Sequence, residues 1–144
     1  IPEIIPVDSL FGNVVPLFKE ETDAIRILPA SSHLQVIADK TLIEQILINL
    51  IKNALDATKE CTDPQIELSA GINAEGKTFI QVKDNGTGIP ADVQERIFIP
   101  FFTTKPVGSG IGLSISRQIM YMHKGSLTVI SEVGKGSRFL LTFV

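Results

Sequence analysis

The sequence predicts an α/β fold in two layers: a mixed, mainly antiparallel sheet of about five strands, covered on one face by about three helices. Three observations predict it. Residues 40–59 have the apolar periodicity of a helix, and two pairs of alternating segments are each joined by a turn that contains glycine. Further helical segments lie between these hairpins. With 144 residues, the chain has the length of one domain, which we place at residues 1–144.

The first predicted helix covers residues 7–20, after a possible cap at Asp8 or Ser9. Pro16 is expected to kink or end this helix, because proline lacks a backbone N–H. Two short segments of β-type composition follow, joined by a turn that contains proline and serine: residues 24–28 and 34–38.

Residues 40–59 form the clearest predicted helix, with Asp39 as its N-terminal cap. Apolar residues at helical spacing define its core face: Ile43, Ile46, Leu47, Leu50, Ile51 and Ala54. A second stripe of the helix is polar: Gln45, Asn49, Lys52, Asn53 and Asp56. This stripe combines amides with one cation and one acid, which is not the composition of an ordinary solvent-facing helix surface.

Residues 65–72 and 77–83 alternate apolar and polar side chains, and residues 73–76 between them predict a hairpin turn. Asp84 has the same parity as Ile80, so the pleat should direct its carboxylate to the buried side of the sheet. A carboxylate pointing inward requires hydrogen-bond donors. Asp84 is therefore a candidate binding residue.

Pro90 suits the first turn of a short helix that reaches about Ile97, and residues 100–110 are expected to form a mobile loop. The next helix is predicted from about Ile111 to His123. Its apolar side should carry four residues: Ile111, Ile115, Ile119 and Met122. The last two strands should form a hairpin around residues 134–136: residues 127–132 and 137–144.

The composition excludes several classes of function. A net charge of −3 argues against a general binder of nucleic acid or of membrane surfaces. Cys61 is the one cysteine, so an intrachain disulfide is impossible and a reducing compartment is favoured. No signal peptide is evident and no apolar run approaches 18 residues. The sequence begins in the middle of a pattern, which suggests a domain excised from a longer chain.

Two glycine clusters stand about twenty residues apart, at residues 84–88 and 108–112. The second runs into a predicted helix N-terminus, where unpaired N–H groups favour phosphate. It lacks the Gly-Lys-Ser/Thr of a Walker loop and the context of a Rossmann fingerprint. Each cluster also has a simpler interpretation, the first as an Asn-Gly hairpin turn and the second as a flexible turn before a helix.

Asn49 and Asn53 lie one helical turn apart and could be ordinary surface residues. Alternatively, an asparagine oxygen together with phosphate oxygens and water could complete a Mg²⁺ shell. Lys105 could be a solvated loop lysine, or it could neutralise charge during phosphoryl transfer. Both histidines, His33 and His123, are interpreted as structural, because neither has metal-ligand spacing or an acidic neighbour.

Together, these segments resemble the catalytic ATP-binding domain of two-component sensor histidine kinases, in the group that also contains gyrase and MutL ATPase domains. LIEQILINLIKNALDA resembles the asparagine box, DNGTGI the first glycine box, IFIPFFTTK the phenylalanine box and GSGIGLSIS the second glycine box. GKGSRFLLTF resembles the closing strand. The order and spacing agree over nearly the whole chain. The resemblance implies a Bergerat-type ATP-binding fold with ATP and Mg²⁺ as ligands.

The resemblance also implies roles for single residues. Asn53 would bind Mg²⁺, Asn49 and Lys105 would be catalytic, and Asp84 would accept a hydrogen bond from the adenine amino group. The full set of ATP-binding residues expected from the resemblance is Asn49, Lys52, Asn53, Asp84, Gly86, Gly88, Ile89, Thr103, Thr104, Lys105, Gly108, Ser109, Gly110, Ile111, Gly112, Leu113 and Ser137.

Three departures from the pattern matter. Asn49 stands where gyrase-like hydrolases have a glutamate base, and an amide cannot take a proton from water, so hydrolysis should be slow. Asp56 stands where many relatives have a basic residue, and the lid is short. The LDA ending and the TTK segment most resemble kinases of the nitrogen-regulation type. No segment resembles the phosphoacceptor histidine helix, which we expect to precede Ile1 in a longer protein.

The expected function is therefore transfer of the γ-phosphoryl group of ATP to a histidine on a separate dimerisation domain of a sensor kinase. A response regulator is the expected downstream partner, with no nucleic-acid partner and no direct membrane contact by this domain. The domain is expected in the cytoplasm, within a parent protein that could be anchored in the inner membrane. Three alternatives stay open at this point. They are an ATP-hydrolysing, gyrase-like switch, a non-catalytic module that senses nucleotide or binds a partner, and a serine kinase of the anti-sigma type.

Overall fold

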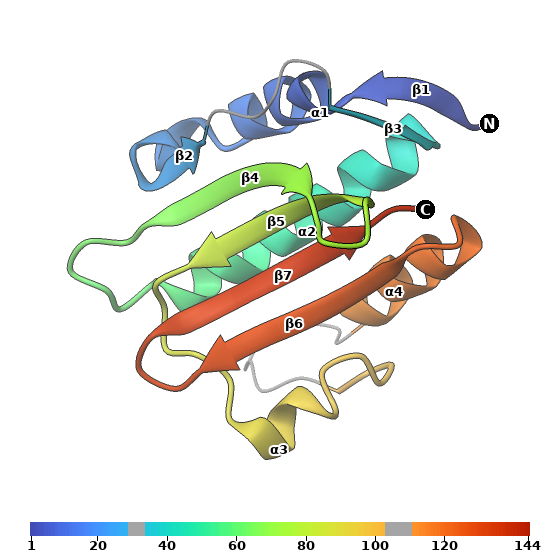
Figure 1. Ribbon diagram of the computed structural model, residues 1–144. Coiled ribbons are helices and arrows are strands. Elements are labelled where there is room, and N and C mark those ends of the chain that lie inside the picture. The colour runs from blue at the N-terminus through green and yellow to red at the C-terminus, as the bar shows by residue number, and fades with distance from the viewer. Residues whose placement is uncertain (29–33, 103–110) are drawn as a thin grey trace.

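The computed structural model describes residues 1–28, 34–102 and 111–144, and the chain folds into a sheet with helices on one face (Figure 1). Five strands form the main sheet, in the order β2-β4-β5-β7-β6. Their bounds are Ile25–Ile27 for β2, Ile66–Ile72 for β4, Thr78–Asp84 for β5, Ser126–Glu132 for β6 and Gly136–Thr142 for β7.

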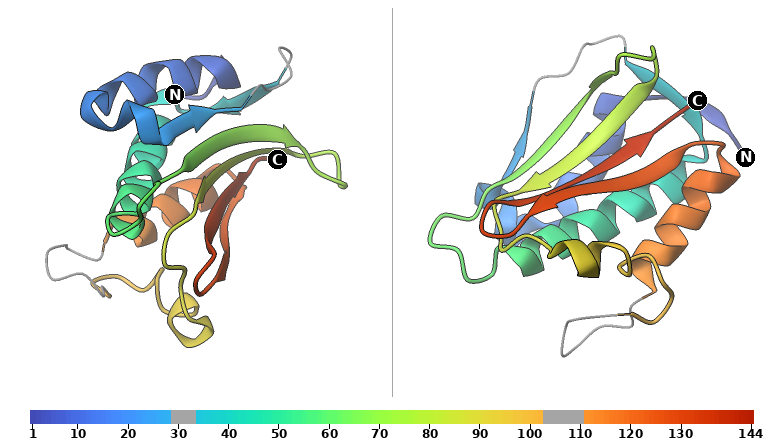
Figure 2. Two further views of the ribbon diagram at one scale, coloured as in Figure 1. Left: turned by 90° about the vertical axis from the view of Figure 1, so that its left-hand side faces the viewer. Right: turned by 60° about the horizontal axis from the view of Figure 1, so that its bottom comes forward.

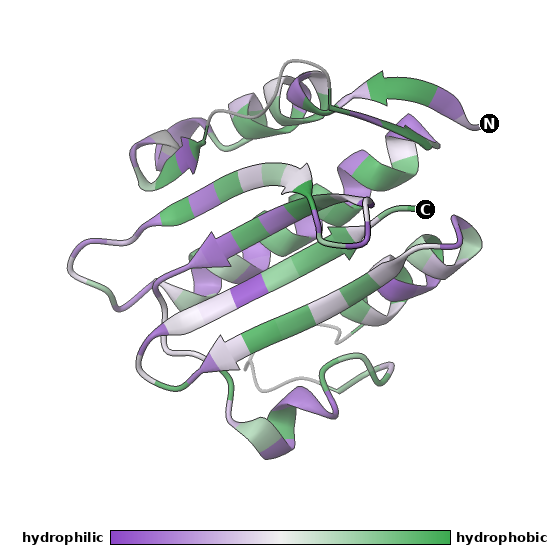
Figure 3. Cartoon of the chain, in the orientation of Figure 1, coloured by the Kyte–Doolittle hydropathy of each residue, from purple (hydrophilic) through white to green (hydrophobic). Residues whose placement is uncertain are grey.

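The main sheet is mixed, as predicted. β2 pairs with β4 in parallel, whereas the β4–β5, β5–β7 and β6–β7 pairs are antiparallel. The turn at residues 73–76 joins β4 to β5, and Gly134 lies in the turn between β6 and β7, so both predicted hairpins are confirmed. Hydrophobic and hydrophilic residues alternate along β5 (Figure 3), because successive side chains point to opposite faces of a strand.

A second, two-stranded antiparallel sheet pairs β1 (Glu3–Pro6) with β3 (Gln35–Ala38). The two short segments predicted at residues 24–28 and 34–38 thus belong to different sheets. The strand β1 was not predicted from the sequence, because Pro2 precedes this four-residue strand and Pro6 ends it, which hides the alternation. The predicted turn between β2 and β3 lies outside the described residues, as does His33.

α2 (Lys40–Ala57) is the central helix, and its prediction is confirmed in detail. The Asp39 carboxylate accepts a hydrogen bond from the backbone N–H of Leu42, which satisfies one of the free N–H groups of the first turn. Every residue of the predicted apolar face is buried: Ile43, Ile46, Leu47, Leu50, Ile51 and Ala54. This face packs against the sheet and so leaves the polar stripe along the side of the helix.

α1 (Val7–Val14) and α4 (Gly112–Met122) lie on the same face of the sheet as α2, and the short α3 (Ala91–Gln94) lies below the β6 edge in Figure 1 (Figure 2). One hydrophobic core joins these layers and includes residues from β1, α1, α2 and the main sheet. The expected two-layer α/β arrangement is therefore confirmed. None of the helices in the described part of the chain is long and apolar enough to cross a membrane.

One prediction about the first helix needs correction, and another is confirmed. α1 begins after Pro6 and has no side-chain cap, and Ser9 instead donates its hydroxyl hydrogen to the carbonyl of Pro6, so neither Asp8 nor Ser9 caps the helix. The regular helix ends at Val14, and a 3₁₀ turn (Val15–Leu17) follows. This break at Pro16 was predicted. A second 3₁₀ segment, Lys19–Ala24, leads to β2.

The predicted apolar side of α4 is confirmed at Ile119 but wrong at Ile115 and Met122. The helix buries Ser116, Ile119 and Met120, whereas Ile115 and Met122 are 42% and 67% exposed. The buried stripe includes a small polar residue, which an apolar pattern does not mark. The short helix α3 also ends earlier than predicted, at Gln94 rather than near Ile97.

Candidate functional site

Three polar residues lie in one row across the main sheet. Ser131 on β6 is the register partner of Ser137 on β7, and Ser137 is the register partner of Asp84 on β5. Directly opposed residues share one face of a sheet, and here it is the buried face, because Asp84 has the parity of the buried Ile80 and Val82. Asp84 and Ser137 are each only 4% exposed, so the inward direction predicted for Asp84 is confirmed.

Asp84 is a buried acid with two identified donors. Its Oδ1 accepts a hydrogen bond from the backbone N–H of Gly86 at 2.8 Å. Burial raises the pKa of the Asp84 carboxyl above its ordinary value of 3.8, while hydrogen bonds from the backbone of Gly86 and Ser137 act in the opposite direction. A carboxylate at this position gains from a further donor, and a ligand N–H group is such a donor.

The loop after Asp84 packs tightly against backbone from two other elements. A Cβ at Gly86 would collide with the carbonyl of Ala57, at the C-terminal end of α2. The backbone N–H of Thr87 donates to that same carbonyl at 3.3 Å. Gly88 has φ +77°, and a Cβ there would collide with backbone at Glu132. Glycine is therefore required at both positions for the loop to approach α2 and β6.

Asn85, between Asp84 and Gly86, ties the loop to the segment before β4. Its side-chain oxygen accepts from the backbone N–H of Gln65 at 2.8 Å, and its amide donates to the carbonyl of Asp63 at 2.9 Å. The Sγ of Cys61 donates to the carbonyl of Asn85 at 3.4 Å. The segment before β4 thus fixes the loop, which indicates a preformed rather than a collapsible site.

At the other end of the polar stripe of α2, Asn49 contacts α4. Its amide donates to the Oγ of Ser116 at 3.5 Å, and a Cβ at Gly112 would collide with the Asn49 side-chain oxygen. Gly112 is the first residue of α4, so free backbone N–H groups lie beside Asn49. Such a helix N-terminus favours a negatively charged group. Ile111 and Leu113, also predicted to bind ATP, flank Gly112 and are half-buried.

Asn53 lies on α2 between these two ends and is half-buried. It is one helical turn from Ala57, which contacts the Asp84 loop, and one turn from Asn49. In the part of the chain that the structure describes, no group of three or more His, Cys, Asp or Glu side chains is placed to hold a metal ion. An amide oxygen is nevertheless a suitable Mg²⁺ ligand when phosphates and water supply the others.

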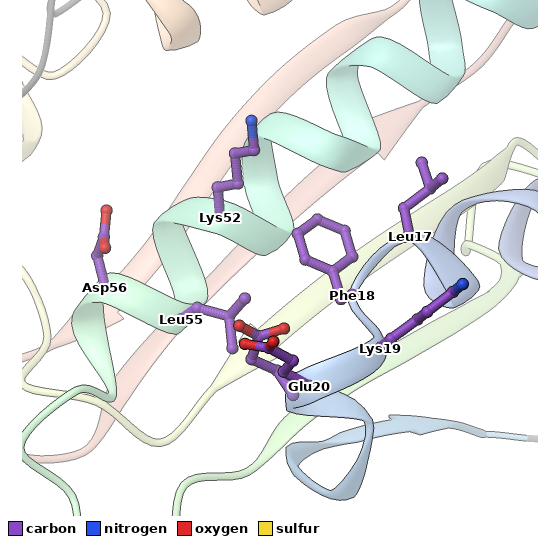
Figure 4. A pocket seen from close by; sticks show the side chains of 8 residues that line it. Leu17, Phe18, Lys19, Glu20, Lys52, Leu55 and Asp56 are labelled. Atoms are coloured by element: carbon purple, nitrogen blue, oxygen red, sulfur yellow. The ribbon is translucent and has the colours of Figure 1, made fainter.

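Lys52 and Asp56 belong to the same polar stripe as Asn49 but line a cavity whose lining does not include Asn49. This cavity of about 670 Å³ is also lined by Leu55 and the segment at residues 17–21. Figure 4 shows Phe18 beside α2 in this cavity, with Lys52 and Asp56 projecting from the helix. The predicted polar stripe therefore has different neighbours along its length: Asn49 contacts α4, and Lys52 and Asp56 line a cavity with the 3₁₀ segments. Binding of ATP by Lys52 stays a prediction.

Several predicted site residues lie outside the described part of the chain: Thr103, Thr104, Lys105, Gly108, Ser109 and Gly110. The described residues that flank this segment contact each other. The guanidinium of Arg117 on α4 lies 4.5 Å from the ring centroid of Phe98 and 5.5 Å from that of Tyr121. The contact with Phe98 joins α4 to the chain that follows α3, and the contact with Tyr121 lies within α4.

The sequence analysis did not identify Ser131, Gln94 or Ser116 as part of this region. Ser131 could have been found, because a hairpin centred on Gly134 places it opposite Ser137. Gln94 and Ser116 gave no signal, because their contacts depend on tertiary packing. Gly136 was placed in the turn, but its role was missed: it has φ +121°, and a Cβ there would collide with the carbonyl of Asp84.

The fold and site together describe a two-layer domain in which one helix links a buried acid to a helix N-terminus. Comparison with known proteins agrees with this description. Residues 38–144 match the histidine kinase-, DNA gyrase B- and HSP90-like ATPases, and the chain belongs to this family.

Similar proteins are sensor kinases. The C4-dicarboxylate transport sensor protein DctB of Rhizobium meliloti is 40% identical over 114 residues, which cover 79% of this chain and 18% of that protein. This chain thus spans less than a fifth of the length of this curated relative. The catalytic domain of histidine kinase ThkA, in a nucleotide-free form, is 32% identical with a TM-score of 0.86, covering 99% of this chain and 95% of that one.

A third comparison includes a nucleotide analogue. Full-length ShkA, solved in complex with AMPPNP, is 28% identical and has a TM-score of 0.84. The match covers 99% of this chain and 30% of ShkA. The structure of this protein is therefore similar to histidine kinase catalytic domains over nearly all of its length.

Proposed function

We propose that residues 1–144 form the catalytic ATP-binding domain of a two-component sensor histidine kinase, which binds ATP with Mg²⁺ and transfers the γ-phosphoryl group to a histidine of a dimerisation domain. One observation carries the proposal. α2 meets the Asp84 loop at Ala57 and the N-terminus of α4 at Asn49. These residues are eight positions apart, about 12 Å along a helix, which suits a ligand with a base at one end and phosphates at the other.

Each end has the chemistry that its part of the nucleotide requires. The buried Asp84 offers a charged acceptor to an amino group of the base. The N-terminus of α4 offers free N–H groups to phosphate oxygens. Asn53, between them, would hold the metal ion, which neutralises charge on the phosphates during transfer. We expect Lys105 to add a positive charge there.

The reaction itself needs little from side chains beyond position. An imidazole nitrogen of the acceptor attacks the γ-phosphorus, an N–P bond forms, and the bond to the ADP oxygen breaks. No described residue beside the helix N-terminus is a carboxylate base, because Asn49 occupies the position next to Gly112. The amide can orient a phosphate but cannot activate water. This supports transfer over hydrolysis and disfavours the gyrase-like alternative.

Calorimetry with AMPPNP and Mg²⁺ tests binding. Asn53→Ala should abolish the Mg²⁺-dependent part of the affinity, whereas Gln45→Ala, an exposed residue of the same helix, should not change it. Wild-type affinity in Asn53→Ala would refute the metal assignment. Absence of binding by the wild-type protein would refute the proposed function.

Transfer is tested by mixing the domain with ATP and a fragment that carries an acceptor histidine. Acid-labile phosphate on the fragment is the expected product, and acid-stable phosphate would favour a serine acceptor. Steady release of inorganic phosphate by the domain alone would revive the hydrolysing switch. Binding without either product would favour a nucleotide-sensing module.

The cellular context is part of the same proposal. A response regulator would receive the phosphoryl group from the dimerisation domain. The lone cysteine supports a reducing environment, and we place the domain in the cytoplasm.

A further inference from the structure

Ser131 on β6 is the centre of a hydrogen-bond network beside the base end of the site. Its Oγ accepts from the backbone N–H of Ile89 at 2.7 Å and donates to the carbonyl of Gly136 at 3.1 Å. The same Oγ lies 2.7 Å from the Oγ of Ser137. Ser131 therefore has three partners: Ile89 in the loop after Asp84, and Gly136 and Ser137 at the start of β7.

The capacity of a hydroxyl group fixes the direction of the bond between the two serines. A serine hydroxyl has one hydrogen to donate and two lone pairs to accept with. The Ser131 hydrogen is directed to Gly136, and one lone pair is used by Ile89. In the bond to Ser137, Ser131 is then the acceptor and Ser137 is the donor. All three positions on Ser131 are filled.

This direction determines what Ser137 can offer a ligand. Its single hydrogen points to Ser131, so only lone pairs remain on its oxygen. Asp84 is its register partner on the neighbouring strand, and it is an acceptor when ionised. The Ser137–Asp84 pair thus presents acceptors alone, both of them buried.

Ser131 and Gln94 also hold Ile89, in the loop after Asp84, in place. The N–H of Ile89 is bound by Ser131, and its carbonyl accepts from the side-chain amide of Gln94 at 2.7 Å. Gln94 also donates to the carbonyl of Ser131 at 3.1 Å. Both backbone polar groups of Ile89 are therefore fixed by side chains from β6 and α3. Ser131 therefore affects both the position of the loop at Ile89 and the direction of the Ser137 hydroxyl hydrogen.

We propose that Ser131 is a positioning residue that makes the site select 6-aminopurine over 6-oxopurine nucleotides, by directing the Ser137 hydrogen away from the ligand. The inference rests on the proposed function, because it assumes that the base lies beside Asp84. Adenine carries an amino donor at its 6-position, whereas guanine and hypoxanthine carry an oxygen acceptor there. Acceptors placed beside the 6-position bind the amino group and repel the oxygen.

Removing the Ser131 hydroxyl releases this constraint. In Ser131→Ala the Ser137 hydrogen can rotate towards the ligand and donate to a 6-oxo group. The Ile89 N–H also loses its partner, so the loop is less well fixed. We expect the affinity for ATP to fall about tenfold and the affinity for ITP to stay the same or rise. The preference for ATP over ITP should therefore narrow by about tenfold or more.

The experiment measures Mg²⁺-dependent binding of ATP and ITP to the wild-type chain, Ser131→Ala and Ser131→Cys. Thr128→Ala is the matched control, since Thr128 is an exposed residue of the same strand. Wild-type protein should prefer ATP by about a hundredfold, and the control should keep this ratio. Ser131→Cys keeps the size of the side chain but weakens the acceptor, so it should also narrow the ratio.

An equal loss of affinity for both nucleotides would show that Ser131 is only structural and would overturn the proposal. So would an unchanged ratio with unchanged affinities. Circular dichroism and thermal unfolding first establish that each variant is folded, and Ser131→Cys replaces Ser131→Ala if the latter is not. Unfolding of both would also overturn the proposal. Failure of the wild-type protein to bind ATP would be recognised separately, as failure of the proposed function.

Discussion

The two ends of the site are built differently. At the base end, the glycines of the Asp84 loop and of the β6–β7 turn lie against backbone atoms: Gly86 against Ala57, Gly88 against Glu132 and Gly136 against Asp84. At the α4 end, Gly112 lies against the side chain of Asn49, which also makes a long 3.5 Å hydrogen bond to Ser116. Backbone cannot move aside without breaking a strand or helix, whereas an amide can rotate.

This difference indicates that the proposed base end is preformed and that the proposed phosphate end is adjustable. Hydrogen bonds through Asn85, Ser131 and Gln94 fix the loop on three sides. The first turn of α4 has no buried residue, since Ser116 is the earliest one in the helix. In the proposed function, a rigid surface would select the base, while the surroundings of the transferred group would retain some freedom.

The largest effect is expected from Gly86→Ala. The new Cβ would collide with the carbonyl of Ala57, and the loop would have to leave α2. We expect a loss of about 2–3 kcal/mol in the free energy of unfolding, together with loss of ATP binding. Urea denaturation measures the first and calorimetry the second.

Gly12→Ala is the control for that variant. Gly12 lies within α1 with no atom in the way of a Cβ, so alanine should stabilise the chain by about 0.5–1 kcal/mol. If the Gly86→Ala protein is as stable as the wild type, the loop after Asp84 can adapt to the new side chain. This result would contradict the conclusion that this end of the site is preformed.

Asp84→Asn should reduce the affinity for ATP about tenfold or more. The amide keeps an oxygen for the Gly86 N–H but loses the charge that strengthens a hydrogen bond to the base. Titration of the folded variant with AMPPNP measures the effect. Equal affinity for the two proteins would mean that the base does not lie beside this residue.

The same pair of proteins gives a pH prediction. Burial raises the pKa of Asp84 above 3.8, so the folded state holds the proton more tightly than the unfolded state. Relative to Asp84→Asn, the wild-type chain should therefore lose stability as the pH rises from 3.8 through the raised pKa, and regain it on acidification. Urea denaturation of both proteins over this range tests the sign. A wild-type chain that gains stability with rising pH relative to the variant would contradict it.

Gly112→Ala should have the smallest effect on folding and a selective effect on the nucleotide. Its Cβ would displace the Asn49 amide, so we expect the affinity for Mg²⁺·ATP to fall about fivefold. Stability should change by less than about 0.5 kcal/mol, because only a side chain must move.

A double-mutant cycle sharpens this prediction. In an Asn49→Ala background, Gly112→Ala should cost no further affinity, because the displaced amide is already absent. Additive losses would show that Gly112 acts through the backbone rather than through Asn49.

Much of the fold could be predicted because local patterns agreed with tertiary packing. The apolar face of α2 and its Asp39 cap follow directly from helical spacing, and both hairpins follow from alternation and turn residues. The strand β1 could not be predicted, because it is short and has prolines beside it, and because its pairing with β3 is a tertiary contact.

The candidate site divides in the same way. The inward direction of Asp84 follows from the two-residue period of a strand, so the sequence was sufficient. The contacts of Gln94, Ser116 and Gly136 depend on distant elements and have no local signature. The charged residues of α2 illustrate a limit of periodicity: Lys52 is close to Asn49 on a helical projection, yet it lines a separate cavity.

One contact at the opposite end of α4 has a mechanical consequence. The backbone N–H of Asp39 donates to the Nε2 of His123 at 3.0 Å, and the Nδ1 of His123 bonds to the carbonyl of Ile119. His123 therefore links the C-terminal end of α4 to the start of α2, and α4 extends about 15 Å from this contact to Gly112. A tilt of about 5° would shift Gly112 by about 1.3 Å while leaving His123 in place, so small motions of α4 are amplified where the phosphates would lie.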